Sequence, residues 1–229
     1  MSDFAGSASS DDIKQRYLSS LGEDYGEFVL GKNTTRILHE DPKLLLFTLA
    51  RYKFVSKMLN GCGAVLEVGC QEGFGAMLVS KVVKRLHAVD FYVPYIASCN
   101  RRIRATNIVF EARDMLDGPI DGPFDGAYAL DVLEHIQPQA EDLFMGNIVR
   151  SMGTYGTLIL GMPSRESQCY ASEASRAGHV NCKSGPELAS FAGKYFLNVF
   201  SFSMNDEVLH TGFYAMSHYL FVVCSNRRE

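Results

Sequence analysis

A glycine-rich turn follows an apolar segment in the first third of the chain. Residues 65–75 read Val-Leu-Glu-Val-Gly-Cys-Gln-Glu-Gly-Phe-Gly. Small residues let the backbone approach a ligand closely, and a helix that begins after such a turn presents free N–H groups. The dinucleotide fingerprint Gly-x-Gly-x-x-Gly does not fit, because Gln71 and Leu78 stand where its two frames need glycine. The turn therefore predicts a nucleotide-type ligand other than NAD.

Strand-like and helix-like segments alternate regularly around this turn. Near-continuously apolar strands that alternate with helices are typical of a parallel sheet covered on both faces. The strand candidates are Ala64–Gly69, Leu86–Asp90, Asn107–Glu111, Asp125–Asp131 and Thr157–Met162. Helical periodicity is present in Phe74–Arg85, Pro94–Arg104 and Gln139–Met152.

The two ends of this region differ from its centre. Asp41 and Pro42 predict the start of a helix that reaches Asn60, and a capping box at Ser184 predicts another to about Tyr195. Two strand candidates follow without a helix of their own, Asn198–Met204 and Tyr219–Cys224. We expect an α/β, Rossmann-like fold: a seven-stranded, mostly parallel sheet with a C-terminal antiparallel hairpin and helices on both faces.

The glycine-rich turn resembles the first motif of class I S-adenosylmethionine-dependent methyltransferases, Glu-x-Gly-x-x-x-Gly-x-Gly. The resemblance extends from about Val65 to Cys224, and the family often has glycine where this chain has Gln71. It implies that S-adenosylmethionine is the cofactor and S-adenosylhomocysteine the product. In this first motif it assigns cofactor binding to Glu67, Gly69, Cys70, Gly73 and Gly75.

Three further segments match the same family in order and spacing. Asp90, followed by Phe91, ends the second strand, where the family binds both ribose hydroxyls; a carboxylate suits this role because it accepts two hydrogen bonds. Asp114 resembles the acceptor of the adenine amino group, and Met115 would supply its backbone N–H. Residues 124–135 resemble the fourth-strand motif, which adds Asp131 to the cofactor-binding residues.

Two histidines are candidates for the catalytic base. Methyl transfer from a sulfonium needs little besides alignment, exclusion of water and, for a hydroxyl acceptor, removal of one proton. His135 follows the fourth strand, and His179 lies in the loop Gly178–Asn181. Similar Gly-His loops occur in bacterial methyltransferases of sugars and other small hydroxyl compounds, where the histidine lies near the acceptor. Arg51 is expected to be a solvated charge on its helix.

The resemblance and the chain's size favour methylation of a small polar acceptor. A hydroxyl of a sugar or of a metabolite linked to polysaccharide biosynthesis is preferred. An N-methyltransferase, a methyltransferase of a phosphorylated capsule decoration, and a non-catalytic S-adenosylmethionine-binding regulatory or partner subunit stay open. The DNA amino-methyltransferase motif is replaced by Asp131-Val132-Leu133-Glu134, and the Pro-Cys pair of cytosine C5 enzymes is absent from the sequence.

Composition narrows the range of partners. Twenty-two Lys and Arg residues against 26 Asp and Glu residues give a net charge of −4 and a pI of about 5.9, which argues against nucleic acid. Six cysteines without a Cys-x-x-Cys pair predict reduced thiols, and we expect no metal ligands.

The chain is expected to form one domain in the cytoplasm. Its start lacks the pattern of a secretory signal, and the sequence has no run long enough for a membrane span. We expect residues 1–12 to be a disordered tail and residues 13–229 a single methyltransferase domain, whose residues 13–60 form a helical lid.

Overall fold

A mostly parallel sheet forms the centre of the protein, whose computed structural model describes residues 9–20 and 27–228. Its order is β3-β2-β1-β4-β5-β8-β6-β7. β1 has β2 on one side and β4 on the other, so the order in which the strands are added to the sheet reverses at β1. At such a point a crevice forms beyond the carboxyl ends of the strands. The parallel strands are β1 (Ala64–Val68), β2 (Arg85–Asp90), β3 (Ile108–Ala112), β4 (Phe124–Leu130) and β5 (Met152–Pro163).

Three antiparallel strands complete the sheet: β6 (Phe196–Asn205), β7 (Val208–His210) and β8 (Tyr219–Arg227). β8 lies between β5 and β6, antiparallel to both. The predicted fold class is confirmed, but the described residues form eight strands instead of seven. The additional strand, β7, pairs with β6 across a tight turn in which Asp206 has a φ of +50°, a conformation that Asp tolerates better than most residues.

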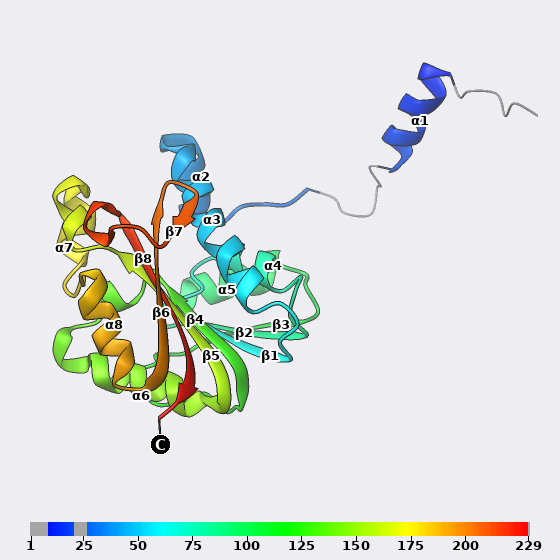
Figure 1. Ribbon diagram of the computed structural model, residues 1–229. Helices are drawn as coiled ribbons and strands as arrows, with labels where there is room; N and C mark the ends of the chain where they lie inside the picture. Colours follow the sequence, from blue (N-terminus) through cyan, green and yellow to red (C-terminus); the bar gives the residue numbers. More distant parts are fainter. Residues whose placement is uncertain (1–8, 21–26, 229) are drawn as a thin grey trace, which may run out of the picture.

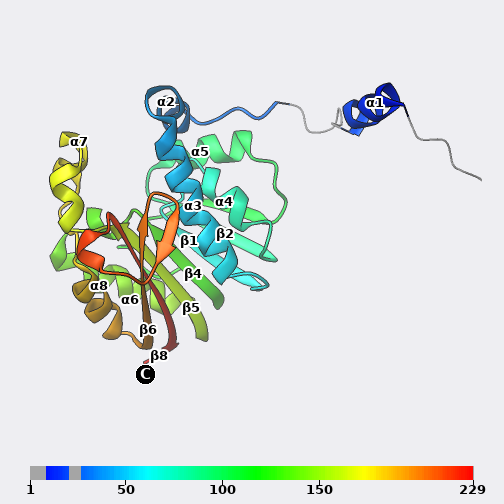
Figure 2. The ribbon, with the colours of Figure 1, turned by 45° about the horizontal axis from the view of Figure 1, so that its top comes forward.

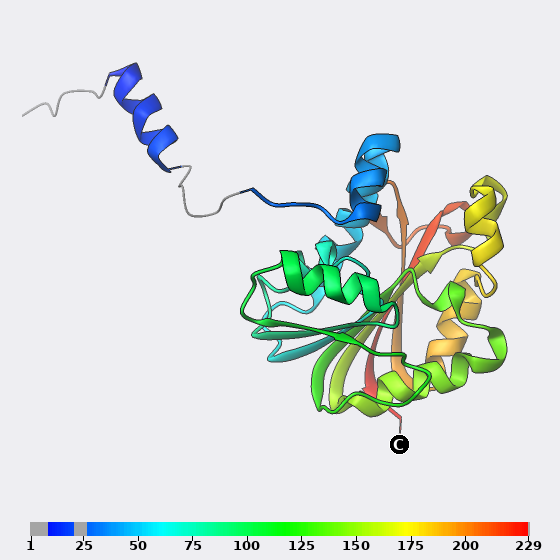
Figure 3. The same cartoon turned by 180° about the vertical axis from the view of Figure 1, so that it is seen from behind.

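Helices cover both faces of the sheet, as Figures 1 and 3 show. Side chains alternate between the faces along each strand, so Val65 packs in one core and Leu66 in the other. The first core contains residues of α3 (Pro42–Met58), α4 (Phe74–Val79) and α5 (Val93–Arg102). The second contains residues of α6 (Glu141–Ser151) and α8 (Gly185–Gly193).

The other helical elements are short or peripheral. They are α1 (Ser10–Ser20), α2 (Lys32–Glu40), α7 (Glu173–Gly178) and the 3-10 turns η1 (Leu133–His135), η2 (Pro138–Ala140), η3 (Glu166–Tyr170) and η4 (Tyr214–Met216). Among the helices of the described ranges, none combines the length and apolar character needed to cross a bilayer.

Two sequence expectations differ from the structure. The helix expected over residues 74–85 ends at Val79, because the next carbonyl groups turn to the side chain of Asn107, which donates to Ser80 O and Val83 O. Residues 1–8 of the expected disordered tail lie outside the described residues. Residues 10–12 instead begin α1, where Ser9 and Asp12 bond each other's backbone N–H groups.

The start of α8 gives a first testable prediction. The Ser184 N–H, assisted by the Ser184 hydroxyl and Arg165, lowers the pKa of Glu187 to about 2. Glu187→Gln is expected to lower the free energy of unfolding at neutral pH by about 1 kcal/mol, a value reduced for solvent screening because the side chain is 48% exposed.

The pH dependence of this effect has a defined sign. Because the folded-state pKa is depressed, the stabilisation is fully present above the ordinary glutamate pKa of 4.5 and is lost as the pH falls toward 2. Denaturant unfolding across this range should therefore show the two proteins converging in acid. An equal difference at every pH would contradict the assignment.

Candidate functional site

A cavity of about 720 Å³ lies at the carboxyl ends of the central strands, a volume typical of ligand pockets. Figure 2 shows α2 and α7 standing above this edge of the sheet. The carboxylates of Asp90, Asp114 and Asp131, which lie at or after the ends of β2, β3 and β4, line it. Of the residues predicted from the sequence, Gly69, Asp90, Phe91, Asp114, Met115, Asp131 and His135 line the cavity, whereas Glu67, Cys70, Gly73, Gly75 and His179 do not.

Asp90 is fixed by two backbone hydrogen bonds. Gln71 N donates to Asp90 Oδ2 and Tyr92 N donates to Asp90 Oδ1, each at 2.9 Å. The carboxylate is 6% exposed and lines the cavity. Each oxygen keeps a second lone pair, so the side chain can brace the turn after β1 and still accept from a ligand.

The turn after β1 has a left-handed backbone. Gly69 has a φ of +81°, and a Cβ added there would lie 2.3 Å from Val132 Cγ2. Gln71, where the family often has glycine, has a φ of +47°, so it keeps the conformation that glycine adopts more readily. The N–H groups of Gly69 and Cys70 both donate to Val89 O. These two donors are therefore not free to bind a ligand.

Glu67 and Gly75, on either side of the turn, both lie against Tyr52 of α3. A Cβ on Gly75 would lie 2.1 Å from the Tyr52 ring, so only glycine lets this tyrosine from α3 pack against α4. The Tyr52 hydroxyl donates to Glu67 Oε1 at 3.0 Å, and Glu67 is 1% exposed. Gly73, with a φ of +72°, precedes α4. A direct role of these residues in cofactor binding stays a prediction.

Burial of Glu67 gives a second prediction. Burial is the main cause that raises its pKa to about 7, against the hydrogen bond from Tyr52. Between about pH 4.5 and 7 the folded state holds a proton that the unfolded state has released, so this group lowers the free energy of unfolding as the pH rises.

Glu67→Gln removes the titration and keeps an acceptor for Tyr52. We expect the variant to gain about 1 kcal/mol over the wild type at pH 8 and nothing at pH 4.5, since burying the extra amide N–H groups offsets part of the gain. Urea unfolding of both proteins at these two pH values measures it. A gain that did not depend on pH would rule out titration of Glu67 as its cause.

Asp114 and Met115 are held by their own turn and by α6. Leu116 N donates to Asp114 Oδ1 at 2.8 Å, and the side chain of the buried residue Asn147 donates to Met115 O at 2.6 Å. Phe91 is 73% exposed although it lines the cavity. Its role in cofactor binding stays a prediction.

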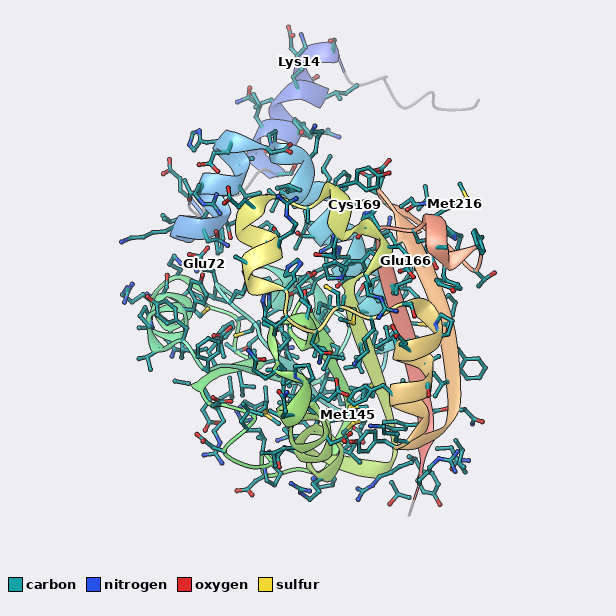
Figure 4. The ribbon with its side chains drawn as sticks, turned by 90° about the vertical axis from the view of Figure 1, so that its left-hand side faces the viewer. Lys14, Glu72, Met145, Glu166, Cys169 and Met216 are labelled. Atoms are coloured by element: carbon teal, nitrogen blue, oxygen red, sulfur yellow. The ribbon has the colours of Figure 1, made fainter. Side chains whose placement is uncertain are left out.

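The segment before α3 is attached to the glycine turn by Glu72. This buried carboxylate accepts from Asn33 N, Thr34 N and the Thr34 hydroxyl at 2.9–3.0 Å, and it thereby caps the start of α2. Figure 4 shows Glu72 beside that helix. Sequence reasoning missed this contact because the partners are 38 and 39 residues apart.

Arg51 is not the solvated charge that the sequence predicted. Its Nη1 lies 3.0 and 2.9 Å from the two carboxylate oxygens of Asp131, and its side chain is 15% exposed. The guanidinium lies over the Tyr219 ring, 3.8 Å from the centroid. Asp131 itself has a φ of +57°. Arg51 therefore connects α3 to the end of β4 and to β8, and it holds a carboxylate of the cavity.

His135 and His179, the two candidates for the catalytic base, lie close together. Their ring centroids are 5.1 Å apart. Val180 N and Asn181 N both donate to Glu134 O, which fixes the loop after α7 against η1. Burial, and then the neighbouring His135, lowers the pKa of His179.

Glu134 was not predicted as a site residue. It is 0% exposed, and both of its carboxylate oxygens are without a hydrogen-bond partner among the described residues. Burial, and then the charge of Asp131, raises the pKa of Glu134 well above its ordinary value. The signal in the sequence was its position beside His135, because an acidic residue next to a candidate base is itself a candidate site residue.

Comparison with known proteins identifies a sequence family that part of the chain resembles. Residues 65–156 match the sequence family described as "Methyltransferase domain". These residues are therefore similar to a methyltransferase domain. The matched segment includes the glycine turn and the three aspartates that line the cavity, Asp90, Asp114 and Asp131.

Two mycobacterial proteins resemble part of the chain. A probable S-adenosylmethionine-dependent methyltransferase of Mycolicibacterium smegmatis is 28% identical over 102 residues, which are 44% of this chain and 38% of that protein. Another, of Mycobacterium tuberculosis, is 31% identical over 101 residues, which are 44% of this chain and 36% of that protein. The chain thus matches well under half the length of these curated relatives.

A solved structure agrees with the domain's architecture. The N-methyltransferase NodS of Bradyrhizobium japonicum, in complex with S-adenosyl-L-homocysteine, superposes with a TM-score of 0.62 at 20% identity, covering 82% of this chain and 90% of that one. At this identity the likeness shows the fold. The α/β fold predicted from the sequence is thereby confirmed by a second line of evidence.

Proposed function

We propose that the protein transfers a methyl group from S-adenosylmethionine to a hydroxyl group of a small polar acceptor. The observation that carries this proposal is the cavity itself, which is lined by Asp90 and Asp114, from the ends of adjacent strands, and by His135. Two carboxylates suit a ribose and an adenine amino group, and an imidazole suits an acceptor that must lose a proton.

The residues of the cavity fit this cofactor. Asp90 keeps free lone pairs on both oxygens, Asp114 lines the same cavity, and Gly69 leaves no side chain where the backbone borders it. Bound S-adenosylmethionine supplies an activated methyl group on its sulfonium. The chain's own residues then hold the acceptor in line, exclude water and take up the hydroxyl proton near His135.

A sugar, or a metabolite linked to polysaccharide biosynthesis, is the preferred acceptor. Support comes from the Gly178–Asn181 loop, which brings His179 to His135 beside the cavity. An amine is the alternative acceptor, because NodS, which shares the fold, is named as an N-methyltransferase. A hydroxyl acceptor needs a group that takes up its proton. The paired imidazoles can do so, and they therefore favour a hydroxyl acceptor over an amine.

Transfer of labelled methyl groups tests the proposal. The protein and labelled S-adenosylmethionine are incubated with a bacterial extract, which is then separated into polar metabolites, nucleotide-linked sugars, polysaccharide, nucleic acid and protein. We expect label in a small-molecule or saccharide fraction, on oxygen. Label on nitrogen would replace the acceptor class, and bound S-adenosylhomocysteine without label in any fraction would favour a regulatory subunit.

A further inference from the structure

A buried carboxyl group and two imidazoles meet beside the cavity. One potential ligand atom from each of Glu134, His135 and His179 lies within 4.8 Å of those of the other two. Within residues 9–20 and 27–228, this is the one group of three or more His, Cys, Asp or Glu side chains that approach one another so closely. His135 lines the cavity, so the group borders the space available to a ligand.

Glu134 lacks the partners that a buried carboxyl group requires. It is 0% exposed, and among the described residues neither carboxylate oxygen has a hydrogen-bond partner. Arg51 is a nearby cation, but its Nη1 is bonded to Asp131. A carboxyl group buried without hydrogen bonds is costly unless a cation or a metal compensates it.

In both histidines Nε2 is the ring nitrogen without a hydrogen-bond partner among the described residues. His135 Nδ1 lies 2.9 Å from Gly178 O, which can only accept, so Nδ1 carries the hydrogen. His179 Nδ1 lies 2.8 Å from Gln168 Oε1, and the Gln168 amide is oriented by its bond to Ser164 O at 3.0 Å. In its neutral form each ring therefore presents an Nε2 lone pair. Acceptors that orient Nδ1–H in this way are typical of metal-binding histidines.

We propose that Glu134, His135 and His179 bind a divalent transition-metal ion. Two imidazoles and one carboxylate suit ions such as Zn²⁺, Mn²⁺ and Fe²⁺, with further coordination positions left for water or substrate. The expectation of no metal ligands rested on the spacing of the cysteines, whereas these three residues are brought together by the loop after α7. Metal binding by itself does not depend on the proposed methyl transfer.

The position of the ion suggests a role that does rest on the proposed function. Beside His135 it would border the part of the cavity assigned to the acceptor. Coordination of a hydroxyl group to a divalent ion lowers the pKa of that hydroxyl. With the ion bound, the two imidazoles would act as ligands and not as the base, and the hydroxyl proton would leave to solvent. The site would thus select acceptors with a hydroxyl, or a pair of hydroxyls, able to reach the ion.

Metal titration of the purified chain tests the proposal. After removal of bound metal with a chelator, Mn²⁺ is added and the free ion is counted by electron paramagnetic resonance, and Zn²⁺ binding is measured by calorimetry. We expect one ion per chain. Glu134→Gln and His179→Ala should weaken binding by about 100-fold or more, and Gln168→Ala, which removes only an orienting acceptor, by about 10- to 100-fold.

His87→Ala is the matched control. His87 Nε2 lies 2.8 Å from Glu111 Oε2 on neighbouring strands, so this variant also removes a histidine paired with a carboxylate. It should bind Mn²⁺ as the wild type does. No binding of either ion by the wild type, or undiminished binding by Glu134→Gln, would overturn the proposal.

Calorimetry with S-adenosylhomocysteine separates the two proposals. Cofactor binding without metal binding would overturn the metal site alone. Metal binding without any binding of S-adenosylhomocysteine would support the metal site and overturn the proposed function.

Discussion

Arg51→Met is expected to lower the free energy of unfolding by about 3 kcal/mol, because it leaves Asp131 without its cationic partner at the wall of the cavity. Methionine keeps much of the apolar stem that packs near Tyr219 but removes the guanidinium. Removal of one member of a buried ion pair is much more costly than removal of both. We take the low end of that range because Asp131 is 28% exposed.

Two companion variants test the cause. Arg36→Met removes an arginine from an ion pair with Glu40 whose side chains are 59% and 61% exposed, so it should change stability by less than about 0.5 kcal/mol. Arg51→Met combined with Asp131→Asn should recover about 1–2 kcal/mol, because Asn also tolerates the left-handed backbone and carries no charge. If denaturant unfolding shows no recovery in the double variant, the loss comes from packing.

Asp90→Ala is expected to weaken binding of S-adenosylhomocysteine by about 10- to 100-fold, or about 1.5–3 kcal/mol. It removes charge-assisted hydrogen bonds to the ribose and also the acceptors of Gln71 N and Tyr92 N. Asp90→Asn keeps one acceptor oxygen, and we expect an intermediate loss. Calorimetry on all three proteins measures the series.

Asp125→Ala is the control for this series. Asp125 Oδ2 also accepts a backbone N–H, from Ala64 at 2.8 Å, but Asp125 is not among the residues that line the cavity. The variant should lose stability and keep its affinity for S-adenosylhomocysteine within about 2-fold. Unchanged affinity in a folded Asp90→Ala protein would refute the ribose assignment.

The features that could be predicted from the sequence are those determined by residues close together in the chain. The five parallel strands have local apolar runs, and the turn at residues 65–75 has glycines where the backbone needs a left-handed conformation. Asp90 and Asp114 lie at strand ends, and topology alone brings the carboxyl ends of parallel strands to one edge. Their placement follows once the alternation of strands and helices is recognised.

The features that were missed depend on contacts between distant segments. Arg51 pairs with Asp131, 80 residues away, and a charge on an amphipathic helix gives no sign of such a partner. Glu134 and His179 meet because the loop after α7 bonds to Glu134 O, a contact that no local pattern encodes. β7 was missed for another reason: its three residues are too few to show a periodicity.

The position of β8 has a consequence for the order in which the molecule can form during synthesis. β8 supplies the partner of β5 on one side and of β6 on the other, with register pairs that include Leu158 with Cys224 and Phe202 with Phe221. Until residues 219–227 have left the ribosome, β6 and β7 have no neighbour that joins them to the parallel strands. The sheet is therefore closed by the last of its strands to be translated, and the Arg51–Tyr219 contact forms in the same late step.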